Sequence, residues 1–383
     1  MIKGSGGEAG PVRSTRFTCG MEKVRAQVAT DLGFALIGCG RIGKRHADLL
    51  SSGAVPGARL VAVCDTDPER VAAFASAYGV PGFADLEEMV AKARPDVANV
   101  CTPSGDHAQT TIALAGLGVH VVVEKPMALT LDDADRMILA CAENRVKIFV
   151  VKQNRLNLPI QKTFEAVSQG RLGKLVMGTV RVRWCRDDSY YQQDAWRGTW
   201  AQDGGVLANQ ASHHIDVLEW MMGDVDSVFA MARTALADIE VEDTAVALLK
   251  FRSGALGAVE ATTATRPKDL EGSLSLLGEL GSIEVGGFAL NELKTWNFVT
   301  PAPDDVDVRE RFSVNPPDVY GFGHRMYLDH VVDCIRSDTQ QLVDGFEGRR
   351  SLELISAIYE SIETGTEIPI RFKAQHSKLG RSS

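Results

Sequence analysis

Residues 34–43 read Phe34-Ala35-Leu36-Ile37-Gly38-Cys39-Gly40-Arg41-Ile42-Gly43. An apolar run typical of a buried strand ends here in a Gly-x-Gly-x-x-Gly pattern, and apolar residues at helical spacing follow at once. Gly38 permits a tight turn, Gly40 lets the backbone approach a diphosphate, and Gly43 lets the new helix pack close to the strand. The first turn of that helix offers free N–H groups and a positive dipole end to an anion. The run therefore predicts a phosphate-binding turn that includes Arg41 and Ile42.

A second apolar strand with an acidic end strengthens this interpretation. Leu60–Cys64 is apolar, and Asp65 follows it, 22 positions after Gly43. An acidic side chain at this place can accept hydrogen bonds from both ribose hydroxyls and repels a 2′-phosphate. The alternative is a plain glycine turn before a core helix. Strand, turn, helix, strand and acid in this order predict a dinucleotide site that favours NAD over NADP.

Length and composition set the class of protein. The chain has 383 residues, of which 45% are hydrophobic and 24% charged, so we expect about two ordinary globular domains. A net charge of −9 argues against nucleic-acid or membrane-surface binding that depends on bulk charge. No apolar stretch approaches the roughly 20 residues that a membrane helix needs. Seven cysteines without a Cys-x-x-Cys pair fit a reducing cytoplasm better than disulfides or a zinc site, so we expect a cytoplasmic protein.

The order of the predicted elements divides the chain into domains. Strands and helices alternate over residues 33–151, which predicts a Rossmann dinucleotide-binding domain with a doubly wound parallel sheet. Short strands separated by Gly turns dominate residues 152–373, which predicts an α+β domain with a large, mostly antiparallel sheet. The family resemblance given below implies that this domain binds the substrate and forms the oligomer. Residues 1–32 are interpreted as a disordered extension and 374–383 as a frayed, basic tail. The alternatives for the N-terminal stretch are an upstream start, with Met21 as the true initiator, and an organelle-targeting segment. The predicted fold class is α/β.

Polar residues follow two predicted strands of the first domain. Thr102, Pro103 and His107 come after one strand, and Glu124-Lys125-Pro126 follows the next. Ligands of such sheets bind beyond the carboxyl ends of the strands. A partly desolvated lysine near a positive nicotinamide has a lowered pKa and can take a proton from a hydroxyl. Lys125 is therefore a candidate catalytic base, and the alternative is a solvated lysine at a strand end.

A second group of chemically active residues lies in the other domain, in a predicted helix over Val206–Met222. Asn209, His213 and Asp216 are spaced i, i+4 and i+7, so they share one helix face. Such a face could present an amide and an imidazole to a sugar ring, with Asp216 orienting the imidazole. A metal bound by His213, His214 and Asp216 has no further ligand at suitable spacing, so we expect no metal site. A histidine satisfied within the core is the other alternative.

Five motifs occur in order, and together they resemble one known family. They are Gly-x-Gly-x-x-Gly-x-x-His (38–46), Thr-Pro-x-x-x-His (102–107), Glu-Lys-Pro (124–126), Trp-Arg (196–197) and Gly-Gly-x-x-x-Asn-x-x-x-His-x-x-Asp (204–216). Over about residues 33–372 the chain resembles the Gfo/Idh/MocA oxidoreductases. Further stretches are most similar to the UDP-N-acetyl-2-amino-2-deoxy-D-glucuronate 3-dehydrogenases of bacterial surface-polysaccharide synthesis, namely 151–157, 196–200, 209–213, 270–273 and 320–324.

The resemblance implies a function and a set of site residues. It implies NAD-dependent oxidation of the C3′ hydroxyl of a UDP-sugar in lipopolysaccharide synthesis, by a homotetramer, with Lys125 and His213 as acid and base. The implied cofactor contacts are Gly38, Gly40, Arg41, Ile42, Gly43, Asp65, Thr102, Pro103, His107, Glu124, Lys125, Gln153, Trp196 and Arg197. Much of the family has Asp at the position of Asn209. The amide of Asn209 cannot accept a proton at neutral pH, so Lys125 or His213 must be the base. Another sugar or inositol dehydrogenase, and a non-catalytic NAD-binding sensor, are the alternative functions.

A UDP-uronic acid carries a diphosphate and a carboxylate, so its pocket must be locally basic. The run Lys152-Gln153-Asn154-Arg155 enters the second domain where the cleft between the domains is expected. We expect Arg155 to be an anion contact because arginine can donate two parallel hydrogen bonds to a carboxylate, with Lys152 or Arg183 as weaker candidates. The alternative is an ion pair between Arg155 and an acid. The expected substrate contacts are Lys125, Asn154, Arg155, Asn209 and His213.

Overall fold

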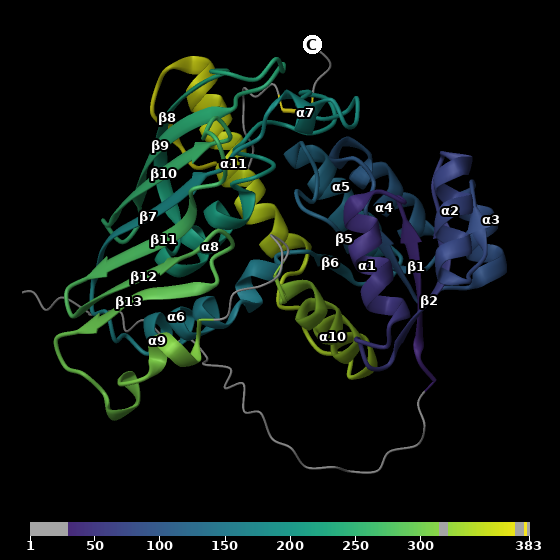
Figure 1. The fold of residues 1–383 in the computed structure, drawn as a ribbon, viewed down its shortest axis with the longest axis horizontal. Coiled ribbons are helices and arrows are strands. Elements are labelled where there is room, and N and C mark those ends of the chain that lie inside the picture. Colours follow the sequence, from purple (N-terminus) through teal and green to yellow (C-terminus); the bar gives the residue numbers. More distant parts are fainter. Residues whose placement is uncertain (1–29, 314–320, 372–378, 381–383) are drawn as a thin grey trace, which may run out of the picture. The chain divides into compact units, whose positions relative to one another are not determined.

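The computed structural model describes residues 30–313, 321–371, 379 and 380 (Figure 1). Its first sheet has the strand order β3-β2-β1-β4-β5-β6, and all pairings are parallel. The strand order reverses beside β1, the arrangement in which a dinucleotide binds at the carboxyl ends of the strands. The strands are β1 (Leu32–Ile37), β2 (Ala58–Cys64), β3 (Gly82–Phe83), β4 (Val97–Val100), β5 (His120–Val123) and β6 (Ile148–Val150).

Helices cover both faces of this sheet. One apolar cluster packs α3 (Leu86–Ala93), α4 (His107–Gly116) and α5 (Leu131–Glu143) on one face. A second cluster packs α1 (Arg41–Ser51) and α10 (Gly323–Arg336) on the other, and these two helices lie beside each other in Figure 1. The remaining helix, α2 (Pro68–Tyr78), is capped by the Asp67 side chain. A chain segment from the far end of the sequence, α10, therefore completes the first domain.

The predicted glycine turn joins β1 to α1. Gly38 has φ +96, and a Cβ there would lie 2.5 Å from the carbonyl oxygen of Cys101. A Cβ on Gly43 would lie 2.1 Å from the carbonyl oxygen of Gly38. Because only glycine permits both approaches, the turn brings the start of α1 directly over the end of β1.

The second sheet has the strand order β13-β12-β11-β7-β10-β9-β8-β14. Within the described residues its pairings are antiparallel except for β7 with β10, so the predicted mostly antiparallel sheet is confirmed. The strands are β7 (Leu175–Arg183), β8 (Val225–Arg233), β9 (Thr244–Phe251), β10 (Leu256–Thr262), β11 (Glu271–Gly278), β12 (Gly281–Gly286), β13 (Glu292–Phe298) and β14 (Ile368–Pro369).

Two of these strands, β8 and β13, were not predicted. In β8 the buried Val228 and Ala230 alternate with Phe229 and Met231, which are exposed yet also apolar. The strand therefore lacks the apolar–polar alternation that marks a half-buried strand. The last strand is short, because β14 pairs with β8 only through Ile368 and Pro369.

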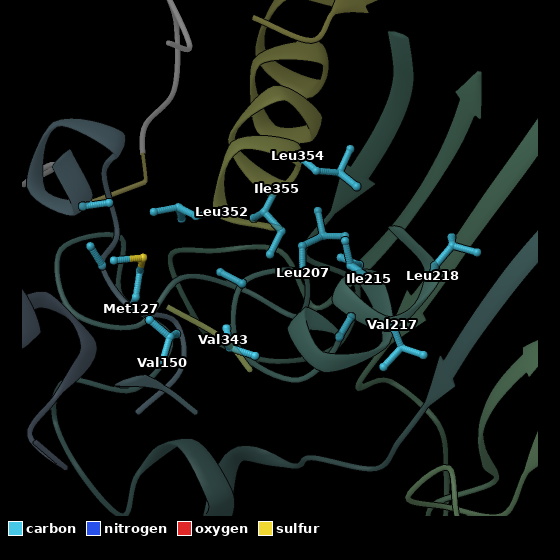
Figure 2. Close-up of a cluster of buried hydrophobic side chains, with 14 of the residues drawn as sticks. Met127, Val150, Leu207, Ile215, Val217, Leu218, Val343, Leu352, Leu354 and Ile355 are labelled. Carbon is cyan, nitrogen blue, oxygen red and sulfur yellow. The ribbon is translucent and has the colours of Figure 1, made fainter. Parts of the chain in front are cut away.

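Helices on the inner face of the second sheet bind it to the first domain. They are α8 (Ser212–Met222) and α11 (Gly345–Thr364), while α6 (Leu158–Ser168) contacts β12. Figure 2 shows part of the shared core, in which Met127 and Val150 belong to the same apolar cluster as Leu207, Ile215 and Ile355. The two sheets are thus joined by one continuous core. The shorter helical segments are η1 (Ser104–Asp106), η2 (Gln153–Leu156), α7 (Asp188–Tyr191), η3 (Pro303–Asp305) and α9 (Val308–Arg311).

The ends of the chain are described only in part. The predicted extension at 1–32 lies outside the described residues up to position 29. Of the predicted tail, Leu379 is 2% exposed, and the Gly380 N–H donates to the carbonyl oxygen of Trp200 at 2.8 Å. These two residues are packed rather than frayed. Among the described helices, none has the length and apolar composition to cross a membrane.

Candidate active site

A cavity of about 1560 Å³ lies at the carboxyl edge of the first sheet and extends to the end of β7 in the second. Sites for one small ligand usually measure about 300–1,000 Å³, so this cavity has room for a dinucleotide and a second ligand. Most of the predicted site residues line it, namely Gly38, Gly40, Arg41, Ile42, Asp65, Thr102, Pro103, His107, Glu124, Lys125, Gln153, Trp196, Arg197, Asn209 and His213. The lining does not include Gly43, Asn154 or Arg155.

The glycine turn leaves space for a dinucleotide. A Cβ on Gly40 would meet no atom within 4 Å, so the backbone there is open to a ligand. Asp65 is held against the turn because its two carboxylate oxygens accept from the N–H groups of Cys39, at 2.7 Å, and Asp67, at 2.9 Å. The buried hydroxyl oxygen of Thr102 has no hydrogen-bond partner within the described chain. These features fit a diphosphate on the turn and a ribose at Asp65.

Lys125 follows β5 and reaches across to the second domain. Its Nζ donates to the backbone oxygen of Asn209 at 2.9 Å and to the Oδ1 atom of the same residue at 3.0 Å. Burial lowers the pKa of Lys125, although the Glu124 and Asp203 carboxylates oppose the shift. A neutral amine has two N–H donors and one lone pair. Asn209 can accept both donors, which leaves the lone pair available to take a proton.

The neighbouring Glu124 is a buried carboxylate held by two histidines. Its Oε1 atom accepts from His46 Nε2 at 2.9 Å and His324 Nε2 at 3.3 Å, and its Oε2 atom accepts from the Lys125 N–H at 3.1 Å. Burial alone would raise the pKa of Glu124, but the hydrogen bonds from both histidines hold that pKa well below its usual value. The ligand atoms of this trio lie within 4.8 Å of one another, as a metal site requires. Because both histidines already hydrogen-bond to Glu124, and Glu124 accepts from the Lys125 N–H, we interpret the trio as the support of the Lys125 backbone.

His213 stands at the start of α8, on the second-domain side of the cavity. Its Nε2 atom lies 3.0 Å from Gln153 Nε2, and its Nδ1 atom has no partner among the described residues. Burial, together with the nearby Lys125 and Lys152 cations, holds the pKa of His213 well below its usual value. The imidazole is therefore neutral near pH 7, and it is a weaker proton acceptor than a lysine with a lowered pKa.

The predicted helix face at 206–222 needs correction. The helix begins only at Ser212, so Asn209 lies on the preceding turn and not on the same face as His213. Asp216 does not orient the imidazole, because its two carboxylate oxygens accept from Arg155 Nε and Nη2, both at 2.8 Å. His213 and Asn209 nevertheless both reach the cavity. The turn at 206–210, which precedes α8, carries Asn209 there, so helical spacing is not the reason.

The prediction of Arg155 as an anion contact is contradicted by the structure. Arg155 is 4% exposed, and its third nitrogen donates to Glu347 at 3.0 Å. Both edges of the guanidinium are thus occupied by acids, which is the alternative that the sequence left open. Lys152 is buried against Ser351 Oγ at 2.7 Å, and Arg183 pairs with Glu260 and Glu271. Neither Lys152 nor Arg183 lines the cavity.

Other residues of the cavity were not predicted from the sequence. Trp184, Cys185 and Arg186 follow the end of β7 at Arg183 and reach the cavity from the second sheet. Arg186 Nη1 donates to Asp269 at 2.9 Å, and its guanidinium lies over the rings of Trp184 and Tyr190. In the first sheet, candidate residues were found because they follow the carboxyl ends of strands. The same criterion, applied to β7, indicates Arg186.

A segment of the second domain crosses the dinucleotide end of the cavity. Asp194 accepts from Arg70 Nη2 of α2 at 3.4 Å and from Arg197 Nε at 3.1 Å. The Arg197 guanidinium lies 4.6 Å from the ring centroid of Trp196. Asp194 thus ties this segment to α2 of the first domain.

Comparison with known proteins gives consistent results. A family model described as the NAD-binding Rossmann fold of an oxidoreductase family matches residues 32–152, and one described as its C-terminal alpha/beta domain matches 165–370. The crystal structure of the WlbA dehydrogenase from Bordetella pertussis, in complex with NADH and UDP-GlcNAcA, is 44% identical with a TM-score of 0.85. It covers 90% of this chain and 99% of its own.

Two further proteins are similar over most of the chain. The WlbA dehydrogenase from Chromobacterium violaceum, in complex with the same two ligands, is 40% identical with a TM-score of 0.84, and covers 92% of this chain and 99% of its own. The myo-inositol 2-dehydrogenase of Thermotoga maritima is 29% identical over 341 residues, which are 86% of this chain and 95% of that protein. The similarity therefore extends over both domains.

Proposed function

The chain belongs to the Gfo/Idh/MocA oxidoreductase family and is an NAD-dependent dehydrogenase of sugars or polyols, and from this premise we propose its substrate. We propose that it oxidises the C3′ hydroxyl of UDP-N-acetyl-2-amino-2-deoxy-D-glucuronate, which is UDP-GlcNAcA, to the 3-keto sugar. The observation that carries this proposal is the identity of 44% and 40% to two dehydrogenases crystallised with NADH and UDP-GlcNAcA. A role in bacterial surface-polysaccharide synthesis, in the cytoplasm, is part of the proposal.

The mechanism assigns the proton to Lys125. NAD, which the glycine turn and Asp65 would hold, would supply the acceptor for the hydride from C3′. As the C3′–H and O–H bonds break and the C=O bond forms, the lone pair of Lys125 takes the hydroxyl proton. Asn209 holds the other two N–H groups of the amine, and the unpartnered Nδ1 atom of His213 is available to hydrogen-bond the same hydroxyl. The burial of both groups excludes water, so the protein contributes position and a base of lowered pKa.

A substrate with a diphosphate and a carboxylate needs cations in the cavity, and Arg186 is the best-placed candidate in the second domain. Its Nη1 atom is held by Asp269 and the Cys185 carbonyl oxygen. Its Nε and Nη2 atoms donate no hydrogen bond to the described residues, so one edge of the guanidinium is open to a planar anion. We propose Arg186 in the role that the sequence analysis gave to Arg155.

The substrate proposal predicts a strong preference for the acid. Wild-type protein should show a kcat/KM about 10–100-fold higher for UDP-N-acetylglucosaminuronate than for UDP-N-acetylglucosamine, since charge-assisted hydrogen bonds contribute about 1.5–3 kcal/mol. Arg186→Met should remove most of that preference by slowing the acid alone. NADH absorbance measures both rates. Equal wild-type rates on the two sugars would exclude the uronic acid as the preferred substrate. An unchanged preference in Arg186→Met would exclude Arg186 as the residue that binds the carboxylate.

A second candidate function comes from the relatives that act on free polyols. The myo-inositol 2-dehydrogenase covers most of both chains, although at 29% identity. The substrate panel should therefore include myo-inositol and simple hexoses beside the UDP-sugars. Turnover of myo-inositol above that of every UDP-sugar would favour this second function.

The position of Asp65 predicts the cofactor preference. Asp65→Ser should narrow the preference for NAD over NADP by about tenfold, because the carboxylate that repels a 2′-phosphate is lost. Kd values for NADH and NADPH, measured by protein fluorescence, give the ratio. Asp67→Ser is the matched control, because Asp67 also lines the cavity and serine keeps the helix cap. An equal effect of both variants would mean that general charge, and not Asp65, sets the preference.

The outer face of the second sheet supports the proposed homo-oligomer. Apolar side chains on adjacent strands are exposed there, among them Met231 (65%), Leu248 (59%) and Leu256 (59%). Arg181 and Arg183 lie beside the acids Glu260, Glu271 and Glu284 on the same sheet. A patch with both an apolar row and charges of both signs suits a second copy of this chain, packed face to face in a tetramer.

A further inference from the structure

Asp203 is a buried carboxylate that lies behind the cavity wall. It is 1% exposed and does not belong to the cavity lining. Its Oδ2 atom accepts from the Gly198 N–H at 2.8 Å, and its Oδ1 atom accepts from Asn209 Nδ2. The same Asn209 accepts from Lys125 Nζ through Oδ1 at 3.0 Å. A carboxylate outside the cavity is thus connected to the proposed base through a single amide.

The ionised carboxylate determines which way this amide points. A carboxylate only accepts hydrogen bonds, so the Nδ2 atom of Asn209 must face Asp203. The Oδ1 atom must then face Lys125, where it accepts one of the two N–H donors of the amine. The second donor goes to the Asn209 backbone oxygen at 2.9 Å. With the amide turned around, an N–H group would face the lysine and the amine would lose its position.

We propose that Asp203 is a positioning residue for Lys125, which acts through Asn209 by orienting its amide and by placing a negative charge behind it. This inference rests on the proposed function, in which Lys125 accepts the substrate proton. Asp203 touches neither substrate nor cofactor. Its effect is on the direction of the Lys125 lone pair and on the basicity of the amine.

The charges around the pair are consistent with this role. Burial raises the pKa of Asp203 to about 6, against the opposing effects of the Gly198 N–H, Asn209, Arg197 and Lys125, so it is mostly ionised at neutral pH. Burial lowers the pKa of Lys125. Of the charged groups that act on the amine, Glu124 and Asp203 raise this pKa, while Lys152 and Arg197 lower it. Removal of the Asp203 charge must therefore move the pKa of Lys125 further down.

The test exchanges the side chains at positions 203 and 209. In Asp203→Asn the amide that replaces the carboxylate can accept from only one of its two donors, so the orientation of Asn209 is lost. In the double variant Asp203→Asn/Asn209→Asp, Asn at 203 accepts from Gly198 through its oxygen and donates to the new carboxylate through its nitrogen. That carboxylate accepts from Lys125. The complete chain of hydrogen bonds is restored with the charge one residue nearer to the base.

Asp203→Asn is expected to lower kcat by about 10²-fold, the order of loss that misplacement of a reacting group by an ångström causes, with KM for NAD within about threefold of wild type. The double variant should recover at least tenfold of that loss. The substrate is whichever sugar the panel identifies, so an error in the proposed substrate does not affect this experiment. A folded double variant no more active than Asp203→Asn would overturn the inference.

The pH profile of kcat separates this role from a structural one. The base must be unprotonated, so activity rises with pH through the pKa of Lys125. The rising part of the pH profile, called here the pH limb, should move to lower pH in Asp203→Asn. It should return to higher pH in the double variant, because a nearby carboxylate stabilises the ammonium form of Lys125. The single variant decides the matter even if the double variant is insoluble. A limb that stays in place in Asp203→Asn would overturn the inference.

Two control variants separate a specific effect on Lys125 from a loss of stability and from an error in the proposed base. Asp243→Asn removes another carboxylate that is 1% exposed and accepts from the backbone N–H groups of Ala235, Leu236 and Ala237, outside the cavity lining. It should lower the melting temperature without moving the pH limb. Lys125→Ala should be nearly inactive. If it kept its turnover, the proposed base and this inference would both fall, whereas an inactive Lys125→Ala beside a normal Asp203→Asn would overturn the inference alone.

Discussion

Lys125→Ala is expected to lower kcat and kcat/KM together by about 10²–10⁴-fold, the usual contribution of a positioned base. The amine is directed by two hydrogen bonds to Asn209, and burial lowers its pKa toward the range in which a lysine accepts protons. The side chain contributes little to cofactor binding in this arrangement, so the Kd for NADH should stay near wild type. Steady-state rates and fluorescence titration with NADH measure the two quantities.

Two further variants decide whether the proton goes to Lys125 or His213. His213→Ala should cost only about tenfold in kcat, because burial and two nearby lysines keep the imidazole neutral and weakly basic. Lys162→Ala is the matched control, a lysine with a 12% exposed side chain that pairs with Glu165 outside the cavity lining. If His213→Ala lowered kcat more than Lys125→Ala does, the histidine would be the base.

Arg155→Met is expected to destabilise the fold by about 3–5 kcal/mol, the usual cost of removing one member of a buried ion pair. Asp216 is 1% exposed, and it would lose both hydrogen bonds to the guanidinium. Lys152 Nζ, at 3.8 Å from Asp216, is the cation that stays nearby. The midpoint of urea unfolding, compared with that of the wild type, measures the change.

The same variant also separates structural stability from substrate recognition. Arg155→Met should affect UDP-N-acetylglucosaminuronate and UDP-N-acetylglucosamine equally at temperatures where it is folded. Arg155→Met/Asp216→Leu/Lys152→Met should recover most of the stability, because it removes all three charges of this buried cluster. A selective loss on the acid, with normal stability, would return Arg155 to the list of substrate contacts.

The first domain was predictable because its determinants are local. The glycine spacing in Phe34–Gly43 and the acid after β2 each specify a backbone shape or a charge within one strand–turn–helix unit. The parallel order of the strands then brings their carboxyl ends together at one edge. For this reason Thr102, His107 and Lys125 could be expected to face one cavity without any knowledge of the second domain.

The second domain was predicted only in outline, because its geometry depends on distant partners. The strand β8 is apolar on both faces, so its pattern gave no period, and helical spacing wrongly extended α8 back to Val206. Arg155 and Asp216 are 61 positions apart, and whether a buried arginine meets an acid of its own chain or an acid of the substrate has no local signature.

The sequence by itself thus determined the class of fold, the dinucleotide turn, NAD as the cofactor and the lysine at the end of β5. The tertiary structure alone decided which charges are paired with one another and which face the cavity. Arg155 is occupied by Asp216 and Glu347, Arg186 keeps one open edge, and Asp203 reaches Lys125 through Asn209. The reason is physical: backbone shape follows from neighbours along the chain, whereas the partner of a charge follows from what the completed fold leaves beside it.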